Sequence, residues 1–387
     1  MSEMKNAVGA GTGRSGDDLC VGNSVHEFKI WADVLNYGKK ILKNAGIVEA
    51  DLDAWYLFEQ SFGISRAQYF LCARENIVGS TAQKIAVQEQ HRDLLESGNA
   101  LECAELWLKE KLSVYESALK KRVARIPLQQ IIGRQEFMGL TFFVNEHVLI
   151  PRQDTETLVE LVLQEQKDKD ISILDMCTGS GCIAVSLKKL GGYAHVEGAD
   201  ISEESLKVAK RNSEEILENN DVNNDAVNSR TEQIQNCTNL TNNQNKQDNS
   251  EERMVSEASK LSQAGVTFRH SDMFSNFPET EQFDVIVSNP PYIPSAVIEE
   301  LEPEVRDHEP RGALDGTADG LYFYRILAEE CAKHLTPGGH VYFEIGYDQG
   351  AAVKELLDIH GFKDTRVIQD LAGKDRVVCG AWQTAGV

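Results

Sequence analysis

The sequence predicts an α/β fold, in which a doubly wound and mostly parallel sheet follows a smaller helical domain. Between residues 171 and 345, short apolar runs typical of strands alternate with segments of helical periodicity. One of these runs leads into a glycine loop, and a later one leads into the tetrapeptide Asn-Pro-Pro-Tyr at residues 289–292. Alternating strands and helices indicate a parallel sheet, and such sheets bind ligands beyond the carboxyl ends of their strands.

The part of the chain before the sheet divides by composition. Residues 1–24 are polar and rich in glycine, which predicts a flexible tail. Residues 25–120 show helical periodicity and are expected to form the helical domain, with Ser65 as the N-cap of one helix. Residues 121–150 are expected to be a linker that contains a β-hairpin around Gly139, and residues 151–387 are expected to form the α/β domain.

The first strand of the sheet is expected at residues 171–175, and an apolar helix pattern begins at Cys182. The glycine loop between them consists of Cys177, Thr178, Gly179, Ser180 and Gly181. Glycines let a backbone turn sharply and approach a ligand closely. The spacing is G-x-G rather than G-x-G-x-x-G, and no P-loop lysine follows. The loop therefore favours a small nucleoside ligand over a pyrophosphate, and it disfavours a nicotinamide-dependent dehydrogenase.

The second strand, at residues 194–199, ends at Asp200. An acidic residue at this place in a strand–loop–helix–strand unit is suited to binding the hydroxyls of a ribose. The competing interpretation is that Asp200 caps the helix that follows. Because the complete order of elements is present, ribose binding is favoured.

Two further strands are expected, at residues 266–270 and 340–345. The first of them leads to Asp272, Met273 and Phe274. Asp272 or the backbone beside it is placed to meet the edge of an adenine, and the two apolar side chains are placed to flank its face. The alternative is that these residues only anchor their loop in the core.

The Asn-Pro-Pro-Tyr loop follows the apolar strand expected at residues 283–288. Pro290 and Pro291 fix φ and remove two backbone donors, so the loop offers carbonyl acceptors. Asn289 adds an amide, and Tyr292 adds a flat ring with a polar end. Together these groups suit a planar substrate that carries an NH2 group. The simpler interpretation of the tetrapeptide alone is a proline-rich turn after a strand.

Taken in order, these motifs resemble the class I S-adenosylmethionine-dependent methyltransferases, and among them the peptide chain release factor N5-glutamine methyltransferases. The resemblance covers about residues 31–382, apart from one insertion. The other segments that carry it are residues 130–133, 136–140, 150–156, 309–316, 344–347 and 370–376. It implies a Rossmann-like sheet of seven strands, S-adenosylmethionine as the methyl donor and release factors as protein partners. The helical domain would help to dock the release factor.

The resemblance also implies roles for single residues. Residues 177–181 would line the S-adenosylmethionine pocket, Asp200 would hold the ribose, and Met273 would lie beside the adenine. Asn289 would contact both the cofactor and the substrate amide, and the rest of the Asn-Pro-Pro-Tyr loop would complete the glutamine site. Two residues depart from the family pattern, because Gln153 replaces a usual proline and Cys177 replaces a usual glycine.

The implied reaction transfers a methyl group to the side-chain amide nitrogen (N5) of the glutamine in a Gly-Gly-Gln motif. An amide nitrogen is a weak nucleophile, because its lone pair is delocalised into the carbonyl. The side-chain oxygen of Asn289 and the carbonyl of Pro290 would accept its two hydrogens. Tyr292 would form a wall of the site and exclude water.

Composition limits the alternatives. The net charge is −22 without a basic run, which argues against a broad phosphate-binding surface and direct nucleic-acid binding. Because no apolar stretch of spanning length and no signal peptide pattern are present, a cytoplasmic protein without membrane contact is expected. The eight cysteines form no C-x-x-C pair, and Cys177 and Cys182 lack metal-ligand spacing, so reduced thiols and no metal are expected.

Residues from about 213 to 262 are rich in Asn, Gln, Asp, Ser and Glu, with few large apolar side chains. Such a composition cannot bury enough apolar surface to offset chain entropy, which predicts a disordered insertion in the catalytic domain. A short helix is a further expectation for residues 251–261.

Two other acceptors remain open. One is a glutamine of a ribosomal protein. The other is an exocyclic amine such as adenine N6, since an Asn-Pro-Pro-Tyr loop also occurs in enzymes that methylate a flipped base. A further alternative, from a different functional class, is a module that binds the cofactor without turnover. The intact Asp200 and Asn289 weigh against that interpretation.

Overall fold

The computed structural model describes residues 28–87, 100–218 and 265–383. These residues divide into two compact units at the boundary between residues 124 and 125. The expected tail at residues 1–24 lies outside the described residues. The expected helix at residues 251–261 also lies outside them.

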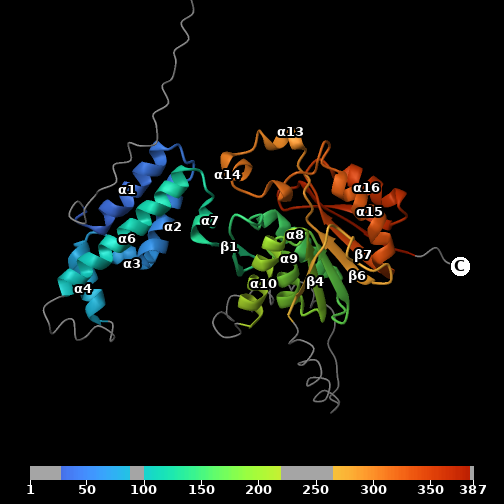
Figure 1. The fold of residues 1–387 in the computed structure, drawn as a ribbon, viewed down its shortest axis with the longest axis horizontal. Coiled ribbons are helices and arrows are strands. Elements are labelled where there is room, and N and C mark those ends of the chain that lie inside the picture. The colour runs from blue at the N-terminus through green and yellow to red at the C-terminus, as the bar shows by residue number, and fades with distance from the viewer. Residues whose placement is uncertain (1–27, 88–99, 219–264, 384–387) are drawn as a thin grey trace, which may run out of the picture. The chain divides into compact units, whose positions relative to one another are not determined.

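The described part of the first unit is helical (Figure 1). Its helices are α1 (Trp31–Asn44), α2 (Ala50–Phe62), α3 (Arg66–Cys72), α4 (Ile77–Val87) and α6 (Ala100–Val123). Trp31, Phe58, Phe62 and Tyr115 are buried at its centre, and neighbouring rings contact one another edge-on or at a tilt, with centroids 4.9–6.2 Å apart. Aromatic side chains bury large apolar areas, so this cluster supplies much of the unit's core.

The cap at Ser65 is confirmed. The backbone amide of Gln68 donates to Ser65 Oγ at 3.4 Å, and the amide of Ser65 donates to Gln68 Oε1 at 2.9 Å. This reciprocal pair satisfies two amides that the first turn of α3 leaves free.

The helical unit ends later than the expected residue 120, because α6 continues to Val123. The physical reason is Arg122, whose Nε donates to Asp53 Oδ2 on α2 at 2.7 Å. The side chains of Arg122 and Asp53 are only 10% and 7% exposed. A buried ion pair of this kind holds the last turn of α6 against α2.

The second unit begins with α7 (Leu128–Ile132) and a two-stranded hairpin of β1 (Arg134–Phe137) and β2 (Leu140–Phe143). Met138 and Gly139 form its two-residue turn, and both have positive φ, at 54° and 75°. A turn with two left-handed residues matches the twist of the strands it joins. The hairpin expected around Gly139 is therefore present, whereas α7 was not expected.

The main sheet has seven strands in the order β5-β4-β3-β6-β7-β9-β8. In this order, each neighbouring pair of strands from β5 through β4, β3 and β6 to β7 is parallel. Strand β9 pairs antiparallel with both β7 and β8. The strands are β3 (Ser172–Met176), β4 (His195–Asp200), β5 (Thr267–His270), β6 (Phe283–Ser288), β7 (Leu335–Glu344), β8 (Lys363–Gln369) and β9 (Asp375–Ala381). The doubly wound, mostly parallel sheet is confirmed.

Helices cover both faces of the sheet. Val285 and Val287 of β6 pack into the core shared with α8 and α9, while Ile286 between them packs into the core shared with α15 and α16. This alternation follows from the period of two in a strand. Figure 1 shows α8, α9 and α10 in green and α15 and α16 in orange-red. These helices are α8 (Gln153–Glu165), α9 (Cys182–Ser186), α10 (Glu203–Glu218), α15 (Tyr322–His334) and α16 (Gly350–Ile359), and α9 continues as a π-helical turn, η4 (Leu187–Gly191).

Two boundaries differ from expectation. β7 begins at Leu335 instead of residue 340, because a bulge with Gly338 at φ 88° lets residues 335–339 join the sheet. Residues 213–218, which were expected to belong to the insertion, instead continue α10 to Glu218, with Ser213 buried. The rest of that expected insertion, from residue 219 on, lies outside the described residues. In the part of the chain that the structure describes, no helix is long and apolar enough to span a membrane.

The buried ion pair of the helical unit yields a stability prediction. Asp53→Ala removes the carboxylate of this buried ion pair, and we expect the free energy of unfolding to fall by about 3–5 kcal/mol. The control is Asp51→Ala, which removes the exposed pair of Asp51 on α2 with Lys43 on α1 and should unfold almost like the wild type. Urea denaturation of the full chain, followed by tryptophan fluorescence, measures both. Equal midpoints for the two variants would contradict a stabilising role for the buried pair.

Candidate active site

The candidate residues lie where neighbouring parallel strands end. Met176, the last residue of β3, pairs with Ala199 of β4 on one side and with Ser288 of β6 on the other. The next residues along these chains are Cys177, Asp200 and Asn289, so the register itself brings the glycine loop, the acid and the Asn-Pro-Pro-Tyr loop to one edge. This edge is where doubly wound sheets bind ligands.

The glycine loop turns sharply at Gly179 and Gly181, which have φ of 54° and 78°. A side chain built at Gly179 would meet no atom within 4 Å, whereas one at Gly181 would come within 3.0 Å of Ala209 on α10. The first glycine therefore leaves one side of the loop open for a ligand, and the second permits close packing of the loop on α10. Thr178 Oγ1 donates to Asp175 Oδ2 at 2.6 Å and ties the loop to its strand.

Asp175 is a fully buried carboxyl under the glycine loop. Besides the Thr178 hydroxyl, its Oδ2 accepts the amide of Ala184 at 3.2 Å. Burial raises the pKa of Asp175 to about 7, and these two hydrogen bonds oppose that shift.

Cys177 occupies a backbone conformation that favours glycine, with φ of 63°. Burial raises the pKa of its thiol, so the thiol is neutral at physiological pH. Its Sγ lies 3.9 Å from the Sδ of Met273, which has a positive φ of 47°. The structure thus brings two of the expected cofactor-binding residues into contact, and the backbone of both is in a strained conformation.

Asp200 supports the glycine loop instead of capping the next helix. Its Oδ2 accepts the amide of Gly179 at 2.9 Å, and its Oδ1 accepts the amide of Ser202 at 2.9 Å. The cap of α10 is Ser202, whose Oγ accepts the amide of Ser205 at 3.1 Å. Burial raises the pKa of Asp200, and the backbone amides oppose this by stabilising the charged form. Each carboxylate oxygen retains a lone pair for a further donor.

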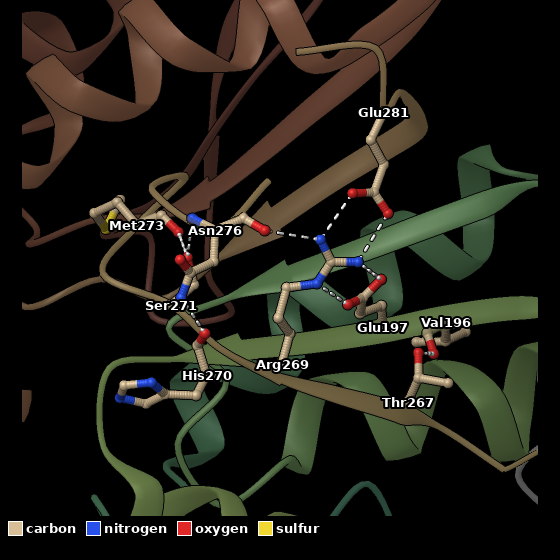
Figure 2. Close-up of polar contacts among 9 residues, drawn as sticks. All are labelled: Val196, Glu197, Thr267, Arg269, His270, Ser271, Met273, Asn276 and Glu281. Carbon is tan, nitrogen blue, oxygen red and sulfur yellow. Dashed lines mark hydrogen bonds and ion pairs between the residues drawn. The ribbon is translucent and has the colours of Figure 1, made fainter. Parts of the chain in front are cut away.

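A charged clamp fixes the loop after β5, as Figure 2 shows. Arg269 donates to Glu197 on β4 at 2.6 Å and to both carboxylate oxygens of Glu281 at 2.8 Å. Its Nη1 also donates to the carbonyl of Asn276 at 3.1 Å, and its guanidinium lies 4.2 Å from the ring centroid of Phe277. Bidentate pairs with two carboxylates give a rigid support.

Within that loop, Ser271 Oγ donates to the carbonyl of Met273 at 2.6 Å and accepts the amide of Asn276 at 3.1 Å (Figure 2). Met273 and Phe274 are buried, whereas the side chain of Asp272 is exposed. Phe274 stacks on His334, with ring centroids 4.9 Å apart, so Phe274 anchors the loop in the core. Met273 remains at the strand edge beside Cys177.

The Asn-Pro-Pro-Tyr loop has a buried middle and half-buried ends. Pro290 and Pro291 are buried, and Asn289 and Tyr292 are partly exposed. Nδ2 of Asn289 donates to Oγ1 of Thr155 at 3.3 Å. The carbonyl of Tyr292 accepts Nε2 of Gln349 at 3.0 Å. The loop is therefore held by side chains from α8 and from the start of α16.

Residues 314–320 hold the same loop by backbone contacts. The backbone amide of Ile293 donates to the carbonyl oxygen of Leu314 at 3.0 Å, and the amide of Gly316 donates to the carbonyl oxygen of Ile293 at 2.9 Å. A side chain at Gly316 would lie 2.7 Å from Cα of Tyr292, and one at Gly320 would lie 2.3 Å from the Tyr292 carbonyl. Both glycines are needed because two backbones touch here. The connection also contains α13 (Ser295–Ile298), α14 (Pro303–Arg306) and η5 (Arg311–Ala313).

Several residues at this edge received no role from the sequence. Arg152 Nη2 donates to Glu309 at 2.6 and 2.8 Å, and thereby joins the segments 150–156 and 309–316. Arg376 on β9 pairs with Asp154 at 2.9 Å and with Asp370 at 3.1 Å. The signal was present, since all five residues lie in segments that carry the family resemblance, but a linear motif does not show which of its residues meet.

Thr155 and Glu344 are two more residues that the sequence did not single out. Thr155 is 2% exposed and contacts Asn289, and Glu344 is 1% exposed and accepts the Tyr292 hydroxyl at 3.4 Å. Among the described residues, no group of three or more His, Cys, Asp or Glu side chains is arranged to hold a metal ion.

Two family models match the chain. The model described as the PrmC N-terminal domain matches residues 33–90 of the helical unit. The model described as the Eco57I restriction-modification methylase matches residues 194–343 of the α/β unit.

Curated relatives match most of the chain. A release factor glutamine methyltransferase from Caulobacter vibrioides is 33% identical over 88% of this chain and 93% of its own length. A second one, from Geobacter sulfurreducens, is 37% identical over 70% of this chain and 78% of its own length. A solved release-factor-specific protein-(glutamine-N5) methyltransferase from Alicyclobacillus acidocaldarius has 23% identity and a TM-score of 0.29, over 63% of this chain and 100% of that one. By its sequence likeness to the curated relatives, the chain belongs to the release factor glutamine methyltransferase family.

Proposed function

We propose that this chain transfers a methyl group from S-adenosylmethionine to the N5 amide nitrogen of the glutamine in the Gly-Gly-Gln motif of peptide chain release factors. The observation that carries the proposal is the Asn-Pro-Pro-Tyr loop, held at the same strand edge as the glycine loop and Asp200 in a chain of this family. A fixed amide-binding loop beside a nucleoside-binding edge suits this transfer.

The residues at the edge fit the proposed methyl donor. Residues 177–181 leave an open side at Gly179, and Asp200 keeps acceptor capacity for the hydroxyls of a ribose. Met273 and the backbone beside the exposed Asp272 would meet the adenine. When bound, S-adenosylmethionine supplies an electrophilic methyl group on a sulfonium sulfur. The glycine loop, Asp200 and Met273 would hold it.

The chain's own contribution to the reaction is to orient the glutamine amide. Oδ1 of Asn289 and the carbonyl of Pro290 would each accept one amide hydrogen, which increases electron density on the nitrogen. Proline lacks an N–H, so the Pro290–Pro291 segment offers no backbone donor that would compete for the amide. Tyr292 would cover the amide and exclude water. Holding reacting atoms at near-attack distance contributes up to about 7–11 kcal/mol in favourable cases.

The helical unit is proposed to dock the protein substrate. It matches the PrmC N-terminal domain model over residues 33–90. Its α3 also carries two exposed apolar side chains, Phe70 at 82% and Leu71 at 83%. Exposed apolar side chains of this size are suited to a protein partner.

The second candidate function is methylation of an exocyclic amine such as adenine N6. The match of residues 194–343 to the Eco57I restriction-modification methylase model favours it, because that match includes the Asn-Pro-Pro-Tyr loop. The formal net charge of −22 weighs against it, since DNA binding needs clustered basic side chains. A ribosomal protein glutamine is a third acceptor, which the site geometry alone does not separate from a release factor.

The acceptor is tested by offering the purified full chain S-adenosylmethionine with a release factor, a ribosomal protein or duplex DNA in separate reactions. Mass spectrometry should find one added methyl, a gain of about 14 daltons, on the Gly-Gly-Gln glutamine of the release factor. A methyl on the ribosomal protein or on DNA instead would overturn the proposed acceptor.

Asn289→Ala removes the proposed side-chain acceptor. We expect kcat to fall by about 100-fold or more, as it does when one charge-stabilising contact is lost, with nearly unchanged affinity for S-adenosylmethionine. Asn44→Ala, at the exposed end of α1, is the matched control and should keep wild-type kcat. Steady-state kinetics and calorimetric binding measure the two effects. Turnover of Asn289→Ala within about threefold of wild type would exclude the role.

Asp200→Ala removes the proposed ribose acceptor. We expect S-adenosylmethionine to bind about ten- to a hundredfold more weakly, which corresponds to a lost hydrogen bond to a charged group. Helix α10 should remain, because Ser202 caps it. Isothermal titration calorimetry measures the affinity, and circular dichroism checks the fold. An unchanged dissociation constant in a folded variant would refute ribose binding by Asp200.

A further inference from the structure

Glu344 has an unusual environment for a carboxyl group. It is the last residue of β7, 1% exposed, and its Oε1 accepts the hydroxyl of Tyr292 at 3.4 Å. Its Oε2 is buried and has no hydrogen-bond partner among the described residues. Leaving a buried carboxylate oxygen without a hydrogen-bond donor costs free energy. A neighbouring donor that turns toward this oxygen therefore stabilises the structure.

Thr155 is a neighbouring side chain with a hydroxyl that can turn toward Glu344. This hydroxyl favours the ionised form of Glu344, since it lowers the pKa of that carboxyl. Its Oγ1 accepts Nδ2 of Asn289 at 3.3 Å. Thr155 is 2% exposed and lies in the first turn of α8, where it contacts the first residue of the Asn-Pro-Pro-Tyr loop.

A hydroxyl has only one proton to donate. If Thr155 gives that proton to Glu344, its oxygen can only accept from Asn289, and the Asn289 amide must turn its NH2 group toward Thr155. The Oδ1 atom then points the other way and is left as an acceptor. If Thr155 gave its proton to Asn289 instead, the amide would flip and present a donor where an acceptor is needed.

We propose that Glu344 and Thr155 are positioning residues, which fix the amide orientation of Asn289 so that Oδ1 is presented to the substrate amide. The proposal rests on the proposed function, since that function is what requires an acceptor at Asn289. Neither positioning residue touches the reacting atoms in this account. Both act through Asn289.

The groups that face Glu344 come from every element packed around it. Arg376 on β9 and the hydroxyl of Tyr292 favour its ionised form, and Asp154 on α8 disfavours it. The Tyr324 hydroxyl on α15 donates to the backbone carbonyl of Glu344 at 2.7 Å. The thiol of Cys182 on α9 also interacts electrostatically with Glu344, and it is neutral because burial raises its pKa. Burial outweighs the favourable partners and raises the pKa of Glu344 to about 7.

This pKa makes the proposed orientation of Asn289 by Glu344 and Thr155 depend on pH. Above about pH 7 the carboxylate accepts the Thr155 proton, and the orientation of Asn289 is fixed. Below that pH the protonated carboxyl no longer requires the Thr155 proton, so the orienting effect is lost as pH falls. The orientation should therefore weaken on the acid side of pH 7 and stay constant on the alkaline side.

The first test needs no turnover. In the full chain labelled with 15N at asparagine, the side-chain NH2 signal of Asn289 is identified by its absence in Asn289→Ala. We expect this signal to shift with a midpoint near pH 7, to lose that shift in Glu344→Gln, and to exchange with solvent at least about tenfold faster in Thr155→Val. A signal that ignores pH and both substitutions would overturn the proposal.

The second test is kinetic. Thr155→Val has nearly the shape of threonine without the hydroxyl, and we expect kcat to fall at least about tenfold while the S-adenosylmethionine dissociation constant is unchanged. Thr155→Ser restores the hydroxyl and should recover most of the lost kcat. The matched control is Thr141→Val, at an exposed position of β2, which should behave like the wild type. A Thr155→Ser variant as slow as Thr155→Val would overturn the proposal.

The outcomes distinguish a failure of the positioning role from a failure of the proposed function. If Asn289→Ala loses turnover while Thr155→Val keeps it, the positioning role is wrong and the proposed function stands. If the wild-type chain methylates no glutamine, the proposed function is wrong. The NMR signal of Asn289 then still decides whether Glu344 and Thr155 orient the amide.

Discussion

The parallel register of β4, β3, β6 and β7 is the constraint on which the rest of the site depends. Because Met176 pairs with both Ala199 and Ser288, the residues that follow all emerge at one edge of the sheet. A shift of one strand by one residue would turn its side chains to the opposite face and separate the two loops. The apolar cores on both faces prevent such a shift, so the packing of the sheet fixes the geometry of the chemistry.

Buried and half-buried polar groups then define the position of each loop. Asp175 and Asp200 hold the glycine loop, Arg269 holds the loop after β5, and Thr155 and Gln349 hold the Asn-Pro-Pro-Tyr loop. The contact of Asp175 with Thr178 is local, whereas the other contacts join residues 21 to 134 positions apart. Polar groups in a low-dielectric interior are costly when unpaired, so a small displacement of any loop has a large penalty. The site is therefore organised before a ligand binds.

Much of this could be predicted from the sequence, because the strong signals are local. The strand at residues 283–288, the turn at Gly139 and the cap at Ser65 each depend on near neighbours, and the structure contains all three. The Arg152–Glu309 pair and the Thr155–Asn289 contact could not be predicted, since each joins residues more than a hundred positions apart. The later end of α6 was missed for the same reason, because it depends on the pairing of Arg122 with Asp53.

The central claim is that the strand edge presents two acceptors to a glutamine amide. A crystal structure of the full chain with S-adenosylhomocysteine and a release factor tests it most directly. The account predicts the glutamine N5 nitrogen at about 3 Å from both Asn289 Oδ1 and the Pro290 carbonyl oxygen. A glutamine held elsewhere, or an Asn289 that turns its NH2 group toward the substrate, would contradict it.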